Sequence, residues 1–409
     1  MNWRPLAMIA AAVLGLVLAG SAQAGVLTVG TGGTYATIQA AVNDAEDGDI
    51  IDILSDITEQ NVRTGSLTNL TFRGQGADVT TVQAHATRGS ATERIFALDG
   101  VLGGTFTFQD MTLKHGNNLS TSGYGYAWGG GAIGTREFKN VDLTIERCAF
   151  VDNNAYNFGG AVAHNQGPNL TVVDCTFSGN QVATESVAST FGGGALYGLS
   201  ITDAVIRSST FSENKIYGKN YQGGGAVQLD PVTSGLIQNS SFVGNEYVGS
   251  LGTVQGSAIY GDAVTTVESC LFADNSYAKF YGLVFLAKGS PPTPGTITNC
   301  VAEEFFGFPT YATDGGGNTD NIADMLIGAL ADNGGPTMTH ALLEGSPAID
   351  AGSNPAGLTH DQRGAPYLRT VGAGTDIGAF ELVPEPATMG LLGLGSFGIA
   401  MMRMRRRRR

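Results

Sequence analysis

The chain is short of basic residues. Its 409 residues hold 22 Lys and Arg against 36 Asp and Glu, and seven of the basic residues lie in the two terminal segments. Nucleic acids and anionic lipid surfaces are bound through clusters of Lys and Arg. We therefore expect no nucleic-acid partner, whereas calcium or a neutral polysaccharide would be compatible with the acidic charge of the body.

Histidine and cysteine are also scarce, and their spacing is not that of a metal site. Zinc sites bring His and Cys together at short fixed intervals, such as Cys-x-x-Cys pairs. The five histidines and four cysteines show no such interval. The sequence therefore predicts neither a metal site nor a cofactor. The histidines are His85, His115, His164, His340 and His360.

Glycine, in contrast, is abundant, with 60 residues, and many of these belong to a repeat. Each repeat has a glycine cluster followed by Ala and an aliphatic residue, then a polar gap, then Phe-x-x-Asn. The clusters lie at 129–133, 159–162, 192–196 and 223–227, with a weaker copy at 256–259. The steps between the equivalent Phe residues are 27, 34, 31 and 30 residues. A period of about 30 residues indicates a solenoid, in which each unit buries its apolar face against its neighbours.

The segments between the glycine clusters are short alternating runs typical of strands, not of helices. The sequence thus predicts an all-β fold, a right-handed single-stranded parallel β-helix of roughly nine turns over residues 25–314. Strands of successive turns would pair in register about 4.8 Å apart, so that like residues stack on like.

Two columns of polar or small residues follow from this alignment. Asn three residues after each Phe would form a structural ladder at a turn, because Asn tolerates left-handed backbone geometry and hydrogen-bonds its stacked copies. These residues are Asn153, Asn180, Asn214, Asn245 and Asn275. All four cysteines fall in the other column, with Ser209 and Ser240. They form either a buried stack of free thiols or two disulfides, Cys148–Cys175 and Cys270–Cys300.

The start of the chain reads as an export signal followed by a cap. Residues 1–24 have Arg4, an apolar run and a small-residue cleavage site, which predicts a secretory signal peptide cleaved between Ala24 and Gly25. Residues 34–45 place apolar side chains on one helical face, and we expect this short helix to cover the open end of the stack.

The end of the chain also carries a predicted sorting signal. Pro384, Glu385 and Pro386 precede an apolar run at 387–402 and a block of Arg residues. This pattern in residues 383–409 resembles the PEP-CTERM sorting signal of Gram-negative bacteria that make exopolysaccharide. The resemblance implies processing by the membrane protease exosortase, a transient inner-membrane location of 387–402, and a final place in the envelope, on the cell surface or in the extracellular matrix. A plain C-terminal membrane anchor is the alternative.

Residues 315–382 lack the period and contain short motifs. Among these are 332–337 (DNGGPT), 345–352 (GSPAIDAG), 361–364 (DQRG) and 376–381 (DIGAFE). They resemble the choice-of-anchor Q module of bacterial surface proteins, which ends β-helical chains, so we expect it to cap the stack. The Gly-Gly-Ala and Phe-x-x-Asn pairs are similar to the repeats of chlamydial polymorphic membrane proteins, which are β-helical adhesins. The body as a whole resembles the pectin-lyase-like fold.

The loops before the glycine clusters are aromatic, and in a solenoid they would gather along one side of the stack. Exposed rings in rows suit the stacking of sugar chains. The candidate ligand-binding residues are Tyr124, Tyr126, Trp128, Tyr156, Phe158, Phe191, Tyr217, Tyr221 and Tyr247. We expect a non-catalytic protein that binds exopolysaccharide or acts as an adhesin or structural component. The alternative for the rings is that they fold down onto the stack.

An enzyme is the competing interpretation, because the pectin-lyase-like fold houses polysaccharide lyases and glycoside hydrolases. Such enzymes need paired carboxylates, or an acidic cluster with a basic residue. The only dense titratable group is Asp350, His360, Asp361 and Arg363, in the terminal segment. We interpret Asp361 and Arg363 as a structural pair and assign no catalytic residue, since fold alone does not imply function.

Overall fold

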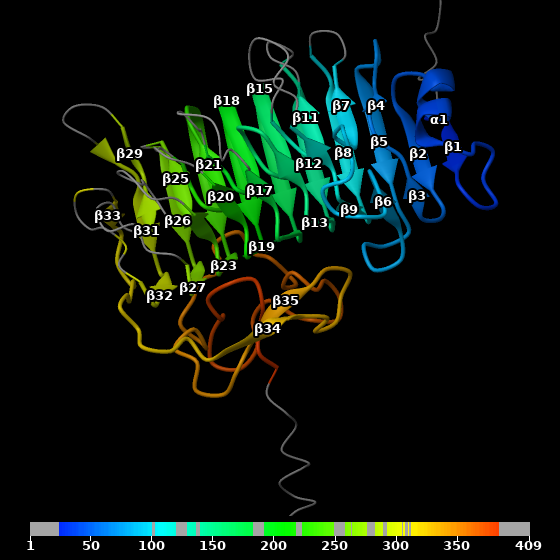
Figure 1. Cartoon of the computed structure of the whole chain (residues 1–409). Helices are drawn as coiled ribbons and strands as arrows, with labels where there is room; N and C mark the ends of the chain where they lie inside the picture. Colours follow the sequence, from blue (N-terminus) through cyan, green and yellow to red (C-terminus); the bar gives the residue numbers. More distant parts are fainter. Residues whose placement is uncertain are drawn as a thin grey trace, which may run out of the picture.

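A computed structural model of the chain confirms the parallel β-helix. It describes residues 24–99, 103–119, 129–135, 140–182, 192–217, 223–248, 258–262, 264–275, 283–288, 293–304, 306, 310 and 312–383. The strands of successive turns pair in parallel and in register, so the chain coils into one long stack, coloured from blue to yellow in Figure 1. Candidate sites at 124, 126, 128, 191, 221 and 384–386 lie outside the described residues.

Each regular turn crosses four faces, which we number in chain order. Face 1 holds β1 (Val26–Val29), β2 (Asp49–Ile53), β5 (Asn69–Arg73), β8 (Thr105–Gln109), β12 (Asp142–Glu146), the second halves of β15 (Val162–Val173) and β18 (Leu196–Arg207), β22 (Val232–Gln238), β26 (Thr265–Glu268), β31 (Thr296–Thr298) and β33 (Thr313–Asp314). Face 2 holds the nine strands β3 (Ile57–Thr58), β6 (Thr81–Gln83), β9 (Thr112–Lys114), β13 (Ala149–Val151), β16 (Thr176–Ser178), β19 (Thr210–Ser212), β23 (Ser241–Val243), β27 (Leu271–Ala273) and β32 (Val301–Ala302).

Faces 3 and 4 complete the turn. Face 3 holds the five strands β10 (Asn117–Asn118), β14 (Asn154–Ala155), β17 (Gln181–Val182), β20 (Lys215–Tyr217) and β24 (Glu246–Val248). Face 4 holds β4 (Val62–Arg63), β7 (Phe96–Leu98), β11 (Ile133–Thr135), the first halves of β15 and β18, β21 (Val227–Leu229), β25 (Ile259–Gly261) and β28 (Val284–Phe285). A short antiparallel pair, β29 (Ala287–Lys288) with β30 (Thr293–Pro294), follows β28.

The core is a set of side-chain columns parallel to the stack axis. Phe150, Phe177, Phe211, Phe242 and Phe272 are fully buried, with neighbouring ring centroids 4.6–5.1 Å apart and planes within 13° of parallel. This spacing matches the distance of about 4.8 Å between paired strands, so strand pairing alone brings the rings into contact. The predicted step between Phe residues is therefore one turn. Phe306 meets the last ring edge-on, at 5.8 Å and 86°.

The asparagines form a continuous hydrogen-bonded ladder beside the Phe column. The Oδ1 atom of Asn180 accepts from both the main-chain N–H and the Nδ2 of Asn153, each at 3.0 Å, and the pattern repeats down to Asn275. Each Nδ2 from Asn180 onward also donates to the main-chain carbonyl of the column Phe in the previous turn, as Asn180 does to Phe150. The left-handed residue is the one before each Asn, such as Asp152 or Glu213, and not the Asn itself as expected. The Asn side chain therefore provides the hydrogen bonds at the corner that the left-handed residue before it forms.

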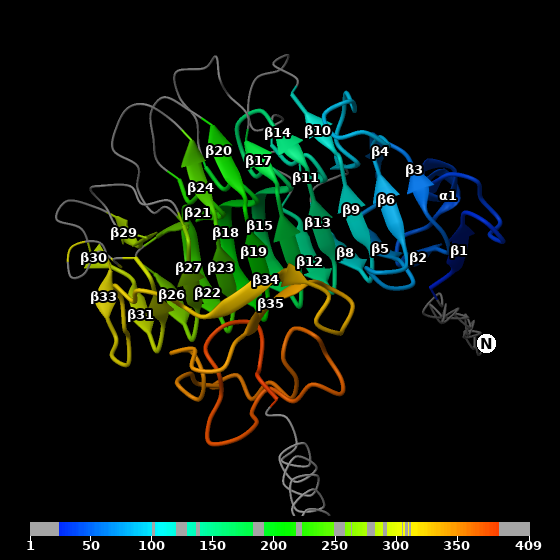
Figure 2. The same ribbon diagram turned by 60° about the horizontal axis from the view of Figure 1, so that its bottom comes forward.

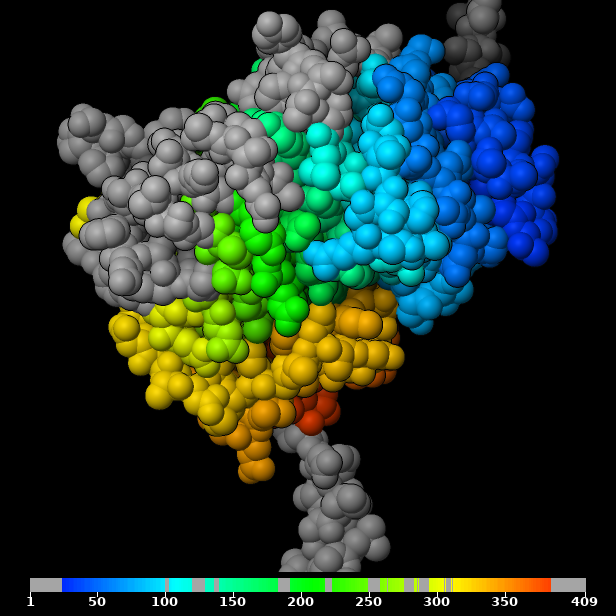
Figure 3. Space-filling view, in the orientation of Figure 1, coloured from blue at the N-terminus to red at the C-terminus, as the bar shows by residue number. Residues whose placement is uncertain are grey.

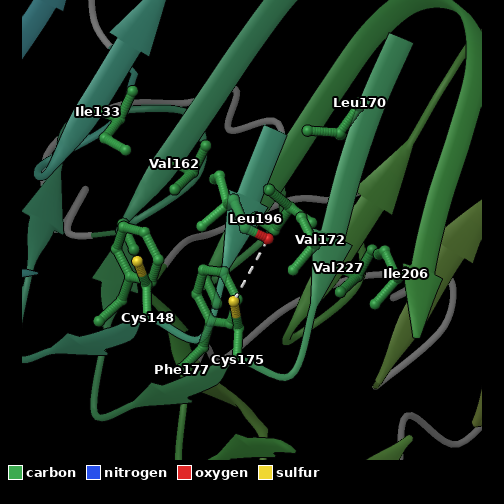
Figure 4. Packing of buried hydrophobic residues seen from close by; sticks show 14 of the residues in the cluster. Ile133, Cys148, Val162, Leu170, Val172, Cys175, Phe177, Leu196, Ile206 and Val227 are labelled. Atoms are coloured by element: carbon green, nitrogen blue, oxygen red, sulfur yellow. Dashed lines mark hydrogen bonds between the residues drawn. The ribbon is translucent and has the colours of Figure 1, made fainter. Parts of the chain in front are cut away.

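The cysteine column is a stack of buried free thiols, so the disulfide alternative is wrong. Cys148, Cys175, Cys270 and Cys300 are all free and fully buried. Each thiol donates to the carbonyl two residues earlier, as do the Ser209 and Ser240 hydroxyls. Figure 4 shows Cys148 and Cys175 at equivalent places in successive turns, beneath the aliphatic column of Ile133, Val162 and Leu196. Burial raises the pKa of the Cys148 thiol to about 12, which keeps it protonated.

A short helix covers the N-terminal end of the stack. Helix α1 (Ile38–Asp44) begins after the N-cap Thr37, whose side chain accepts from the Ala40 N–H, and it buries Ile38, Ala41 and Val42. The helix is shorter than the predicted 34–45, because the first residues of that segment form a turn in which Val29 bridges to Tyr35. The apolar face itself lies where the spacing placed it.

The last described segment, residues 315–383, lies for the most part along the flank of the stack, so the expectation that the whole segment caps the end is wrong. Only its first residues continue the last turn, where Gly315 donates to the Ile297 carbonyl and Thr319 bridges to Val301 in parallel. We call this segment the terminal module. It carries the antiparallel pair β34 (Ile327–Ala331) and β35 (Thr339–Leu342). Figures 1 and 2 show it beneath face 2, and Figure 3 shows its surface continuous with that of the stack. Its apolar residues Met325, Leu342, Ile377 and Phe380 pack with outward side chains of β23, β27 and β32.

The interface of the terminal module is rich in hydrogen bonds. Gln362 accepts from the Thr210 hydroxyl at 2.6 Å and donates to the Thr176 hydroxyl at 2.9 Å. Ser241 accepts from the Ala379 N–H at 3.0 Å, and Ser353 donates to Glu268 at 2.9 Å. The outward Thr and Ser side chains of face 2 thus serve as docking groups.

Replacing Asn214 with Ala should destabilise the fold by about 3 kcal/mol or more. The change removes the acceptor of Asn180 and the donor to Phe177, and each buried polar group left unpaired costs roughly 1–3 kcal/mol. The measurement is the denaturation midpoint compared with that of Ser234→Ala, an exposed residue of face 1. A midpoint equal to that of the control would contradict the ladder's structural role.

Candidate binding face

The predicted ligand-binding aromatic residues that the structure describes lie on or beside face 3. Tyr156 follows β14, Tyr217 ends β20 and Tyr247 lies in β24, and all three are partly exposed. Of the predicted binding residues that the structure describes, these three and Phe158 come from this side of the stack. In Figure 2 the strands of face 3 lie above those of face 2, across from the terminal module.

The register places Tyr156 and Tyr217 in one column. Ala155 pairs with Val182 and Val182 pairs with Ile216, so the residues that follow are also equivalent, and the two tyrosines stand two turns apart. Two turns correspond to about 10 Å along the axis. Tyr247 belongs to the adjacent column, because it pairs with Ile216, which is buried. Partial burial raises the pKa of Tyr247 above its ordinary value.

Phe158 does not present its ring to solvent. It is 4% exposed, and its ring packs at 4.7 Å on Tyr197, which lies on the outer side of face 4. For this residue the alternative holds, and the loop folds its ring down onto the stack. Tyr197 was missed by sequence reasoning. The signal was available, because Tyr197 comes directly after the inward Leu196, and strand residues alternate between faces.

A column of long polar side chains runs beside the tyrosines on face 3. Asn117, Asn154, Gln181, Lys215 and Glu246 are paired in register along the stack. Lys215 and Glu246 form an ion pair of 3.0 Å, and Asn154 donates to Asn117 at 3.0 Å. Ion pairing with Glu246 raises the pKa of Lys215. Asn117 and Asn154 are buried, so this column presents only the Gln181 amide and the Lys215–Glu246 ion pair to a ligand.

The loop between β6 and β7 reaches this side of the stack through Arg88. The Arg88 guanidinium pairs with Asp152 at 2.8 Å and donates to the Gly179 carbonyl at 3.1 Å and to Gln181 at 3.2 Å. It therefore joins a segment of the third turn to the corner between faces 2 and 3 of the turns two and three further on. Half of its side chain is exposed, so the contact borders the candidate binding face.

The Asp361–Arg363 pair of the terminal module has the geometry of a structural ion pair. Asp361 is fully buried and holds Arg363 through bonds of 2.6–3.2 Å. The Arg363 guanidinium lies between the rings of Tyr367 and Phe380, 3.8 Å from each centroid. A carboxylate that is committed in this way has no open side for a substrate. The Asp350 Oδ1 atom accepts from the Ala373 and Gly374 N–H groups, and His360 contacts the Thr359 hydroxyl.

The described residues contain neither a cluster of metal-ligating side chains nor a membrane-spanning helix. Over residues 24–383, excluding the gaps given above, no cluster of three or more His, Cys, Asp or Glu side chains is arranged to hold a metal ion. Within the same residues no helix has the length and apolar character needed to cross a bilayer. The apolar run at 387–402 lies outside them.

Three of the described carboxyls have strongly raised pKa values, namely Glu304, Asp174 and, inside the terminal module, Glu381. Burial raises the pKa of Glu304 to about 7, and this side chain ends the Asn ladder by accepting from the Asn275 N–H at 2.5 Å. The other Glu304 oxygen is buried without a hydrogen-bond partner. Burial also raises the pKa of Asp174 to about 7, at the corner between faces 1 and 2 where Thr337 of the terminal module docks. Glu304 and Asp174 are best accommodated in the protonated state.

The described residues end immediately before the predicted sorting motif. Glu381 is buried, Leu382 donates its N–H to Asp376 at 2.6 Å, and Val383 is 49% exposed. The terminal module therefore holds the chain up to the residue that precedes Pro384. Because the module lies across face 2 from face 3, the end of the terminal module and the candidate binding face are on different sides of the stack.

Comparison with known protein families supports the sorting signal. Residues 382–408 match the PEP-CTERM protein-sorting motif. The match indicates an exported protein that exosortase processes and that associates with the surface of the cell envelope. No curated protein matches the chain.

Stability should fall as the pH rises from about 4 to 7. A carboxyl whose pKa is higher in the folded state contributes its full stability below the ordinary pKa, and this stability is lost as the pH rises through the folded value. Glu304→Gln and Asp174→Asn should each flatten the profile and raise the midpoint at pH 8. The measurement is the urea midpoint at pH 5 and pH 8, with Asp203→Asn, an exposed residue, as the control. An unchanged profile in both variants would contradict this reading.

Proposed function

We propose that this protein is a non-catalytic component of the cell surface or extracellular matrix of a Gram-negative bacterium, and that it binds neutral exopolysaccharide through face 3. The observation that carries the proposal is the opposite placement of face 3 and the chain exit at Val383. A protein attached near its C-terminus would then present face 3 away from the attachment point. The same placement suits an adhesin or a structural matrix component.

The chemistry of face 3 supports a neutral sugar chain. Tyr156 and Tyr217 repeat in one column, and beside them lies the partly exposed amide of Gln181. Ring faces stack on sugars, and amides exchange hydrogen bonds with hydroxyl groups. Lys215 is already paired with Glu246, and the chain as a whole is acidic, so an anionic polymer would meet little attraction.

Exopolysaccharide binding should depend on the aromatic residues of this side. Tyr156→Ala with Tyr217→Ala should weaken retention on the host polysaccharide roughly thirtyfold, because each of the two lost stacking contacts costs on the order of 1 kcal/mol. The paired variant Trp128→Ala with Tyr221→Ala tests the part of the prediction outside the described residues. Affinity electrophoresis in the host polysaccharide measures the effect.

The control for this experiment is Thr144→Ala with Thr171→Ala, which changes two partly exposed side chains of face 1. Equal retention of the wild type, both aromatic variants and the control would overturn the proposed site. Release of unsaturated or reducing-end products from the polysaccharide would overturn the non-catalytic assignment and favour a lyase or hydrolase instead.

Replacing Pro384, Glu385 and Pro386 with Ala should block tail processing. These residues lie in the matched sorting motif, so we expect the variant to accumulate with residues 387–409 still attached. Cell fractionation with intact-mass measurement reads the outcome. Thr388→Ala, a change in the tail outside the motif, is the control. Normal processing of the triple variant would contradict the role of the motif.

A further inference from the structure

Gly25, the residue after the predicted cleavage site, is built into the first turn of the stack. Its carbonyl accepts from the Ile50 N–H at 2.9 Å, which continues the pairing of β1 with β2. Its main-chain nitrogen donates to Oδ1 of Asp49 at 2.7 Å. Both contacts lie at the start of the strand that forms the N-terminal edge of face 1. Ala24, in contrast, is exposed.

The site is shaped for this nitrogen. A Cβ on residue 25 would lie 2.8 Å from Oδ1 of Asp49, so glycine is the residue that allows the close approach. The second Asp49 oxygen accepts from the Glu46 N–H at 2.8 Å, which fixes the carboxylate in place. The Asp49 carboxylate is thus fixed beside the Gly25 nitrogen. While that nitrogen belongs to a peptide bond, it is an uncharged donor.

We propose that removal of the signal peptide converts this contact into an ion pair that fastens the first turn. Hydrolysis of the bond between Ala24 and Gly25 adds the hydroxyl of water to the Ala24 carbonyl carbon and hydrogen to the Gly25 nitrogen. The new amine takes a further proton from solvent, because free α-amino groups have pKa values of about 7.7–8.0. A neutral donor 2.7 Å from Asp49 becomes a cationic one, and charge-assisted hydrogen bonds are roughly twice as strong as neutral ones.

The consequence is a fold whose N-terminal end tightens only after export. β1 is the first strand of face 1, it has four residues, and Val26 is 54% exposed, so this end of the stack is prone to open locally. The precursor lacks the charged contact. This inference concerns the N-terminal end and stands independently of the binding proposed for face 3.

The experiment uses the mature protein recovered from the exporting host. Intact-mass analysis should place the N-terminus at Gly25. The pKa of that amine, measured from the pH dependence of its acylation rate, should exceed the free value of about 8. Asp49→Asn should return the pKa to the free value and speed hydrogen exchange at the Ile50 amide roughly two- to fivefold, the range for a partly exposed ion pair.

Two further variants separate the charge effect from the structural role of Asp49. Asp47→Asn removes a carboxylate of the same turn that bonds Thr68 instead, and it should leave the amine pKa high. Insertion of one Ala between Ala24 and Gly25 keeps Asp49 but moves the amine one residue away, and it should lower the amine pKa as Asp49→Asn does. A mature chain that starts elsewhere, or an amine pKa that is the same with and without Asp49, would overturn the proposal.

Discussion

The structure depends on a backbone that turns each corner with a single left-handed residue. Between faces 1 and 2 these residues form a column from Asp110 to Asn299, and between faces 2 and 3 a second column runs from His115 to Asp274. Most of them are not glycine, although the left-handed conformation costs roughly 1–2 kcal/mol for other residues. The Asn ladder and the thiol and hydroxyl column follow directly after these two corners. Their hydrogen bonds to neighbouring carbonyls and N–H groups offset the cost of the turns.

Because each corner is the same, the columns are continuous, and the properties of the fold follow from this continuity. The Phe rings stack because strand pairing fixes their spacing, and every ladder Asn finds its partner in the next turn. The ladder must nevertheless end. At one end Gly116 donates its N–H to Asn153, and at the other Glu304 takes the place of the next Asn. Glu304 places a carboxyl where the other turns have an amide, and burial at this position raises its pKa.

The periodic part of the molecule was predictable from the sequence, and the non-periodic part was not. The Phe spacing gave the turn length because each turn repeats the same local chemistry, and one aligned column places all the others. Nothing in the sequence of the terminal module says which surface it covers, because Gln362, Ser353 and His340 find their partners 84 to 186 residues earlier in the chain. The same limit applies to Phe158. Its position in a loop follows from the repeat, but its packing on Tyr197 depends on how that loop folds back.

The docking of the terminal module along the flank has a consequence for how such a chain can change in length. The module contacts β16, β19, β23 and β27 at once, through Thr176, Thr210, Ser241 and Leu271. The module therefore fits the stack only when the number of turns between β16 and β27 is unchanged. Duplication of a repeat within this stretch would displace every later docking group by about 4.8 Å and break the match. Insertion before β13, in contrast, would leave it intact, so growth of the solenoid by duplication is expected to be tolerated only toward its N-terminal half.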